Sequence, residues 1–278
     1  MKGQEELPPL SPAGFLAVKT MLYKDTGVSL GEDKAHYVRF RLSGICPGSL
    51  DDFVQNAVAE PDLRELVVEA VLNHETSFFR DWSPFLALRD VLLPELIERR
   101  KEERVLRIWS GACSYGQEVY SLVLLLEEHF REALAGWRVE FLASDVSNEA
   151  LEKARAASYT RLEVNRGLPA ALLLKYFEST GKTFRLKAPF RNRVSFEQIN
   201  LLQSWPSRAP FDLIVLRNVL IYLEVRDKIR VLERMRGAMR PDGALLLGSA
   251  ETTLLLDRSW TPRSVAGSVA YVLNADKA

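Results

Sequence analysis

The chain has 278 residues, enough for a large main domain and a smaller second one. Lysine plus arginine and aspartate plus glutamate each number 37, so the formal net charge is zero. This balance argues against a nucleic-acid-binding protein, which needs a basic excess. Hydrophobic residues make up 47% of the chain, as in ordinary globular proteins.

The number of cysteines and the length of the apolar runs indicate in which cellular compartment the protein is expected. Two cysteines, Cys46 and Cys113, fit a reducing compartment, and the three histidines are too far apart in the sequence to suggest a metal site. Residues 1–9 are polar, are predicted to form a loose tail and contain no apolar signal-peptide core. The longest apolar runs, such as Val119 to Leu126, are too short to cross a bilayer. We therefore expect a cytoplasmic protein without membrane insertion.

The first part of the chain has only helical periodicity, with no strand pattern before residue 100. Ser11-Pro12 predicts a capped helix start. The expected helices are a first interrupted at Gly27, a second from about Glu32 to Ser43, a third after Ser49 and a fourth from Pro61 through Val71. The sequence thus predicts a small all-α N-terminal domain, residues 1–75.

The rest of the chain, residues 76–278, alternates strands and helices. Strands are expected at 105–109, 139–145, 211–218, 244–249 and 268–273, with helices at 84–100 and 226–239. This order predicts an α/β fold with a doubly wound, mostly parallel sheet. Short strand-like pieces at 183–186 and 194–198 indicate a small β insertion at about 178–197.

The stretch between the first strand and its helix contains Gly111 and Gly116. A strand, a tight glycine-containing loop and a helix allow a nucleotide-like ligand to lie against backbone N–H groups at the carboxyl end of a sheet. On the glycines alone, an ordinary strand-to-helix turn is the favoured alternative.

Two carboxylates accompany this loop. Asp145, at the tip of the second strand, is placed to bind a ribose diol, although it could also cap the next helix, a role for which Ser147 competes. Glu118 lies near a helix start and is either a capping residue or a contact to a polar part of a cofactor. The loop lacks G-x-G-x-x-G, which disfavours a nicotinamide cofactor. S-adenosylmethionine has no pyrophosphate and needs no such turn.

Five ordered blocks resemble one family. Residues 74–81 read H-E-T-S-F-F-R-D and resemble the N-E-T-x-F-F-R-D signature of the chemotaxis receptor methyltransferases, the CheR family. Residues 109–121 resemble its W-S-A-G-C-S-x-G-E-E-P-Y-S loop. Residues 143–145, 200–202 and 217–222 match three further blocks in the right order. The resemblance covers nearly the whole chain.

The resemblance implies a class I S-adenosylmethionine methyltransferase fold, which is Rossmann-like. It also implies methyl transfer to receptor glutamates, giving glutamyl methyl esters and S-adenosylhomocysteine. The implied catalytic residues, which face the reacting carboxylate, are Arg80 and Tyr222. The implied cofactor contacts are His74, Thr76, Arg80, Glu118, Asp145, Asn200, Leu201, Arg217 and Asn218.

Physical chemistry fits such a reaction. A glutamate side chain, with a pKa near ~4.3, is ionised at neutral pH and needs no general base, so catalysis is mainly alignment. Arg80 can hold a carboxylate through its planar fork, and Tyr222 can add one donor. From position alone, Arg80 could instead form a domain-linking salt bridge and Tyr222 could pack beneath the sheet.

The chain departs from the family pattern at His74, which replaces the family's asparagine, while Asn73 stands one position early. The expected partners are the cytoplasmic methylation helices of chemoreceptors. Their acidic surface is expected to meet Lys34, Arg39 and Arg41, unless these form a solvated helix face. The stretch 179–183 has one glycine, so we expect no need for the receptor's pentapeptide tether, and we expect a monomer. Two other hypotheses remain open: a methyltransferase for another carboxylate substrate, and a non-catalytic S-adenosylmethionine-binding module.

Overall fold

A computed structural model describes residues 8–274; residues 1–7, part of the predicted tail, lie outside the described residues, as do 275–278. The chain forms two compact units. The first comprises the chain up to Asn73 together with Tyr222–Asp227. The second comprises His74–Ile221 and the chain from Lys228 onward. No helix within residues 8–274 is long and apolar enough to span a bilayer.

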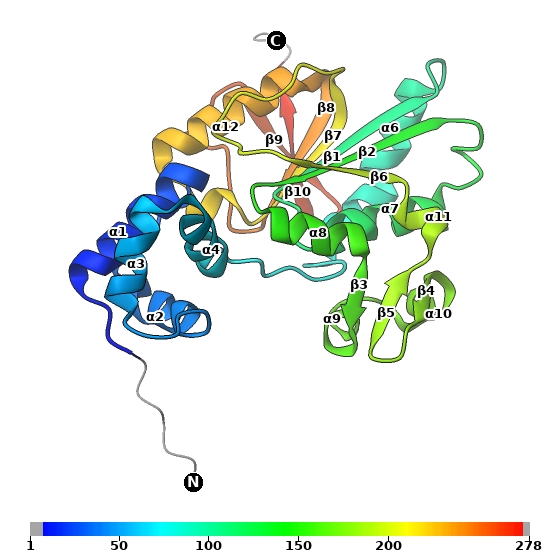
Figure 1. Ribbon diagram of the computed structural model, residues 1–278. Helices are drawn as coiled ribbons and strands as arrows, with labels where there is room; N and C mark the ends of the chain where they lie inside the picture. Colours follow the sequence, from blue (N-terminus) through cyan, green and yellow to red (C-terminus); the bar gives the residue numbers. More distant parts are fainter. Residues whose placement is uncertain (1–7, 275–278) are drawn as a thin grey trace. The chain divides into compact units, whose positions relative to one another are not determined.

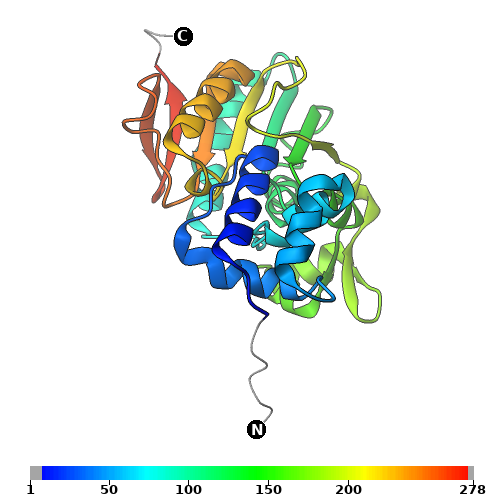
Figure 2. The same ribbon diagram turned by 60° about the vertical axis from the view of Figure 1, so that its left-hand side comes forward.

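The first unit is helical, and Figure 2 shows its helices in blue and teal. Its elements are α1 (Pro12–Thr26), the 3₁₀ helix η1 (Glu32–Lys34), α2 (Ala35–Ser43), α3 (Leu50–Ala59) and α4 (Pro61–Val71). Ser11 caps α1, since its side chain accepts from the backbone N–H of Gly14. The predicted second helix begins as a 3₁₀ turn before becoming α-helical. The core of this unit is aliphatic and includes Leu22, Val38, Leu42, Leu50 and Val67.

The second unit is built on a seven-stranded sheet in the order β6-β2-β1-β7-β8-β10-β9. Its strands are β1 (Val105–Gly111), β2 (Arg138–Asp145), β6 (Val194–Gln198), β7 (Phe211–Leu216), β8 (Met239–Leu247), β9 (Trp260–Val265) and β10 (Ser268–Leu273). Strands β6 to β8 in this order are parallel, whereas β10 and β9 pair antiparallel. The predicted doubly wound, mostly parallel sheet is thus confirmed, and Figure 1 shows its central strands side by side.

Helices connect and cover these strands. They are α5 (Ser83–Ala87), α6 (Leu93–Arg100), α7 (Gln117–His129), α8 (Asn148–Ala156), α9 (Arg161–Asn165), α10 (Ala170–Tyr176), α11 (Ala188–Arg191), the 3₁₀ turn η3 (Leu220–Tyr222) and α12 (Val225–Ala238). The single helix predicted at 84–100 is interrupted by a π-helical segment, η2 (Leu88–Leu92). Pro94, in the first turn of α6, has no N–H to continue the normal hydrogen-bond ladder, which accounts for the wider turn.

A separate three-stranded antiparallel sheet has the order β3-β5-β4. Its strands are β3 (Ser158–Thr160), β4 (Phe177–Ser179) and β5 (Thr183–Leu186). The expected piece at 194–198 is not part of it, because β6 pairs with β2 in the main sheet, beginning at Phe141 and Val194. Without β6, the backbone N–H and C=O groups at the edge of β2 would be unpaired; the parallel strand β6 pairs with them.

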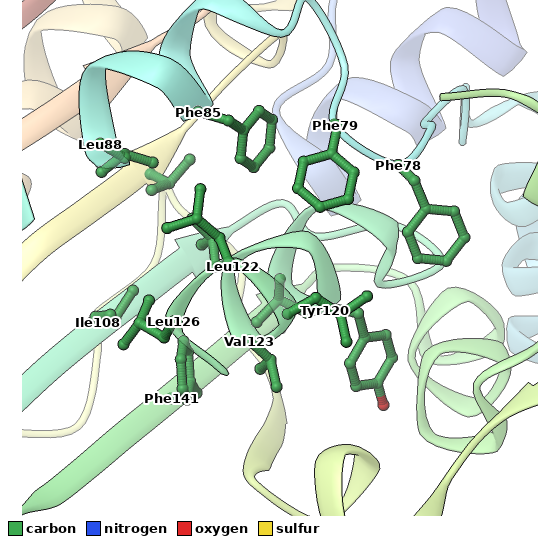
Figure 3. Packing of buried hydrophobic residues seen from close by; sticks show 14 of the residues in the cluster. Phe78, Phe79, Phe85, Leu88, Ile108, Tyr120, Leu122, Val123, Leu126 and Phe141 are labelled. Carbon is green, nitrogen blue, oxygen red and sulfur yellow. The ribbon is translucent and has the colours of Figure 1, made fainter. Parts of the chain in front are cut away.

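The core of the second unit surrounds α7 and β1. Figure 3 shows Leu122 and Leu126 of α7 close to Ile108 of β1, with Phe78 and Phe79 approaching the same helix. All five side chains are at most 6% exposed. The segment that contains residues 74–81 is therefore anchored to α7 by two buried aromatic rings.

Candidate active site

The loop between β1 and α7 is a strained turn at the carboxyl end of the sheet. Ala112, Ser114 and Gly116 all have positive φ, of 52°, 49° and 83°. A Cβ at Gly116 would lie 3.0 Å from the Cβ of Ala154, so glycine is needed both for the conformation and for the space. The backbone N–H of Cys113 donates to the carbonyl of Ser144 (2.9 Å), which fixes the loop against the end of β2.

Asp145 holds this loop in place. Its carboxylate accepts from the backbone N–H of Ser114 (2.7 Å) and of Ser147 (3.0 Å), and the residue is 7% exposed. Ser147 is the N-cap of α8, since its hydroxyl accepts from the N–H of Ala150 (2.9 Å). The capping role that the sequence left open therefore belongs to Ser147, and the Asp145 carboxylate faces the loop.

Arg217 lies at the centre of an ion-pair network. Its side chain is 1% exposed, and its guanidinium donates to the carboxylates of Glu118 (3.0 Å) and Asp81 (2.7 Å) and to the carbonyl of Arg80 (3.0 Å). Glu118 also accepts from the hydroxyl of Ser110 (3.1 Å). Glu118 thus joins β1, α7 and Arg217, and the N-cap position of α7 is occupied by Gly116 instead.

The segment of residues 74–81 is bound to the loop at several points. The Ser114 hydroxyl donates to the carbonyl of His74 (2.8 Å), and the His74 ring lies 5.2 Å from that of Tyr115. The backbone N–H of Phe79 donates to Ser121 of α7 (2.9 Å). Arg80 is half-buried and donates to the carbonyl of Glu75 (3.1 Å) within its own segment.

Backbone strain is concentrated in the turn at the end of this segment, residues 79–82. Phe79, Asp81 and Trp82 have φ of 48°, 66° and 43°, values that non-glycine residues rarely adopt. Such strain persists only where surrounding contacts fix the chain, here the Phe79 and Asp81 contacts to α7 and Arg217. Thr76 lies in the same segment and is half-buried.

Asn200 and Leu201 follow β6. The side-chain oxygen of Asn200 accepts from the N–H of Leu202 (2.9 Å), and the carbonyl of Leu201 accepts from Arg234 (2.9 Å). The preceding Ile199 donates its N–H to the carbonyl of Asp145 (2.9 Å), so this turn lies beside the end of β2.

Asn218 follows β7 and has φ of 60°. Its backbone N–H donates to the carboxylate of Glu251 (2.8 Å), which also accepts from the N–H groups of Gly248 (2.7 Å) and Ile221 (3.3 Å). Glu251 is 8% exposed and was missed by the sequence analysis. The available signal was an acid four residues beyond the end of a buried strand.

The structure therefore brings most predicted residues to one edge of the second unit. The loop, Asp145, Asn200 and the Arg217–Asn218 pair all follow the carboxyl ends of the adjacent strands β6, β2, β1 and β7. Tyr222 belongs to the first unit, where its hydroxyl accepts from the side-chain amide of Asn73 (2.8 Å).

Cys113 lies within the loop but has no nucleophilic character. Burial raises the pKa of its thiol well above the ordinary value, and the nearby carboxylates of Asp145 and Glu118 raise it further. The thiol is therefore neutral at physiological pH.

Comparisons with known proteins settle the family. Residues 74–263 match the family model described as "CheR methyltransferase, SAM binding domain". Chemotaxis protein methyltransferase 1 of Pseudomonas aeruginosa is 38% identical over 247 residues, 86% of this chain and 90% of the relative. The chain belongs to the CheR methyltransferase family.

Two further relatives are also chemotaxis protein methyltransferases. Chemotaxis protein methyltransferase Cher2 of Pseudomonas putida is 37% identical over 85% of this chain and 89% of the relative. The chemotaxis protein methyltransferase of Salmonella typhimurium is 32% identical over 97% and 93%. As a CheR family member, the chain is an S-adenosylmethionine-dependent methyltransferase.

The residues of this CheR site fit that cofactor. S-adenosylmethionine carries a ribose diol and a sulfonium cation. A buried carboxylate at the tip of the second strand, Asp145, suits a diol. A second carboxylate, Glu118, lies in the first turn of α7 and is paired with Arg217.

Proposed function

We propose that this methyltransferase transfers the methyl group of S-adenosylmethionine to glutamate side chains of chemoreceptors, forming glutamyl methyl esters. The proposal rests on a difference between two arginines, Arg217 and Arg80: in the part of the chain that the structure describes, only Arg217 is paired with carboxylates. Asp81 and Glu118 are both paired with Arg217. Within residues 8–274, no carboxylate is ion-paired with Arg80, whose guanidinium donates to the carbonyl of Glu75.

Arg80 therefore supplies the site's cation for a substrate carboxylate. Its fork can hold one oxygen of a glutamate side chain while the other faces the methyl group. Tyr222 adds a second donor to the same carboxylate. When bound, the cofactor supplies an activated methyl group on sulfur.

The reaction needs no residue that accepts or donates a proton. The glutamate oxygen forms a bond to the methyl carbon, the carbon–sulfur bond breaks, and its electron pair stays on sulfur. The substrate carboxylate is already ionised at neutral pH, so alignment by Arg80 and Tyr222 is the main contribution of the chain. We assign cofactor contact to the predicted set, namely His74, Thr76, Arg80, Glu118, Asp145, Asn200, Leu201, Arg217 and Asn218.

We assign receptor recognition to the helical N-terminal domain, residues 1–75, and methyl transfer to residues 76–278 with their β insertion. On α2, Arg39 donates to the carbonyl of Pro8 (3.1 Å) and Arg41 to that of Ala70 (2.5 Å), so both side chains are held in place. With the exposed Lys34 they would meet the acidic methylation helix of a cytoplasmic receptor region.

The protein is proposed to act as a monomer and without a pentapeptide tether. The turn between β4 and β5 is closed on itself, because Thr180 donates its backbone N–H to the carbonyl of Thr183 (2.9 Å) and its hydroxyl contacts that of Thr183 (2.6 Å). Such a tight turn offers little backbone for an added peptide strand.

The test is incubation with radiolabelled S-adenosylmethionine and receptor cytoplasmic fragments, followed by measurement of base-labile label. Wild type should label receptor glutamates, and Arg80→Ala should not. Arg131→Ala is the matched control, since its side chain is 78% exposed and lies two residues beyond the end of α7. Tight cofactor binding with no base-labile label on any receptor would favour a non-catalytic binding module or a different carboxylate substrate.

A further inference from the structure

The segment Tyr222–Asp227 runs from the end of η3 into the first turn of α12 and packs with the helical unit. The backbone N–H of Ser29 donates to the carbonyl of Tyr222 (2.8 Å), and Val28 forms a β-bridge with Leu223. Farther along, the Tyr23 hydroxyl donates to Asp227 (2.7 Å), which is 1% exposed. The backbone position of Tyr222 is therefore determined by the helical unit.

The side chain of Tyr222 is held by the same unit. The Nδ2 amide of Asn73 donates to the Tyr222 hydroxyl at 2.8 Å. Asn73 follows Leu72, the C-cap of α4. The end of α4 is fixed because the hydroxyl of Tyr37 donates to the carbonyl of Val71 (3.0 Å) and the N–H of Leu72 donates to that of Val68 (3.0 Å).

A phenol oxygen that accepts a hydrogen bond keeps its own proton free to donate elsewhere. An accepted bond also polarises the O–H group and strengthens the bond it donates. The amide of Asn73 therefore fixes the direction of the Tyr222 hydroxyl and leaves its proton available to a substrate carboxylate.

We propose that Asn73 is a positioning residue for the methyl transfer, acting through Tyr222. The inference rests on the proposed role of Tyr222. It gives the helical unit a part in the chemistry, because that unit holds the tyrosine by both its backbone and its hydroxyl. It also gives a role to the asparagine that stands one position before His74.

A double-mutant cycle tests this on the full chain with receptor fragments. Asn73→Ala should lower kcat roughly threefold to tenfold, as expected for one neutral hydrogen bond, with KM for S-adenosylmethionine within about twofold of wild type. In a Tyr222→Phe background, Asn73→Ala should have no further effect. Additive losses in the double variant would show that Asn73 does not act through Tyr222 and would overturn the proposal.

Two further variants separate positioning from general damage. Asn73→Gln keeps the amide donor and should recover part of kcat, whereas Asn73→Asp has no donor at neutral pH and should not. Asn56→Ala makes the same truncation at an exposed position of α3 and should match wild type. Equal kcat for Asn73→Ala and Asn56→Ala would contradict the proposal.

A spectroscopic measurement keeps this test distinct from that of the proposed function. With tyrosine labelled with ¹³C at the ring carbon bearing the hydroxyl, the Tyr222 resonance is assigned by its loss in Tyr222→Phe. It should move in Asn73→Ala and stay in Asn56→Ala. Wild type that labels no receptor would refute the proposed function, yet a shifted resonance would still support the Asn73 contact. An unmoved resonance would refute the inference whatever the activity.

Discussion

The carboxylate of Glu118, in the first turn of α7, and the guanidinium of Arg217 lie 3.0 Å apart. Ninety-nine residues separate them in the chain, and the same guanidinium binds Asp81 at 2.7 Å. Arg217, which follows β7, therefore connects that strand to the 74–81 segment and to α7. A change at Arg217 is expected to disturb all three.

Arg217→Ala should lower the free energy of unfolding by about 3 kcal/mol, because it leaves the largely buried Glu118 carboxylate without its counter-charge. Arg131→Ala removes an exposed arginine just beyond the end of α7 and should cost less than about 0.5 kcal/mol, because its partner Glu127 keeps its pair with Arg193. Urea unfolding of both variants gives the comparison. Similar losses in the two would mean that the Arg217 network contributes little to stability.

Asp145→Ala should weaken S-adenosylmethionine binding at least about tenfold, since it removes the carboxylate that we assign to the cofactor and that accepts from the Ser114 N–H. Ser147→Ala removes the cap of α8, which should cost about 1 kcal/mol of stability and leave cofactor affinity within about twofold. Isothermal titration of both variants separates the roles. A parallel loss of affinity in Ser147→Ala would indicate that the loop is merely unfolding.

Gly167→Ala and Gly181→Ala form a matched pair on the second unit. Both glycines have positive φ, of 92° and 88°, so backbone strain in either alanine variant should lower the free energy of unfolding by about 1 kcal/mol. At Gly167 a Cβ would also lie 1.9 Å from the carbonyl oxygen of Phe78, whereas at Gly181 nothing lies within 4 Å. Thermal or urea unfolding should show Gly167→Ala to be less stable than Gly181→Ala by about 1–3 kcal/mol.

The 1.9 Å approach also predicts a functional difference between these two variants. Relief of the clash requires movement of Phe78, which anchors the 74–81 segment. Cofactor affinity should therefore fall in Gly167→Ala and not in Gly181→Ala. Equal affinities would show that the segment tolerates displacement.

Stability should fall at alkaline pH. Burial raises the pKa of the Cys113 thiol and of the Tyr159 and Tyr120 phenols above their ordinary values near 9.0 and 10.0. Above pH 9 the unfolded chain loses these protons while the folded chain keeps them, so unfolding becomes more favourable as the pH rises. The free energy of unfolding measured in urea should be flat near pH 8 and decrease above pH 9.

Cys113→Ala should make that decrease less steep. Each proton contributes up to about 1.4 kcal/mol per pH unit, and the variant lacks one of them. Its difference from wild type should be constant below pH 8 and shrink above pH 9. Parallel curves over the whole range would assign the alkaline transition to other groups.

The sequence was informative wherever local pattern and packing agree. The buried strand Val105–Gly111, the glycine loop and the acid Asp145 at the end of the second strand were all predictable, because parallel strands are apolar throughout and end at one edge. Strand β9 was missed, since Pro262 and polar residues give an edge strand no alternating pattern.

Long-range pairing was the main obstacle. The charged run 98–104 reads as a solvated helix end, yet Arg100 is 4% exposed and donates to Asp212 (2.5 Å) and Asp242 (2.8 Å). No local pattern reveals partners more than a hundred residues away. The same holds for Glu251, whose role depends on backbone groups of the turn after β7.

The division of the chain has a consequence for chimeras between relatives. Because Tyr222–Asp227 packs with residues up to Asn73, the backbone crosses between the two units three times. A hybrid that takes only its first 73 residues from another family member would pair one parent's helices with the other parent's 222–227 segment. A graft of the helical unit therefore calls for both pieces to come from the same parent.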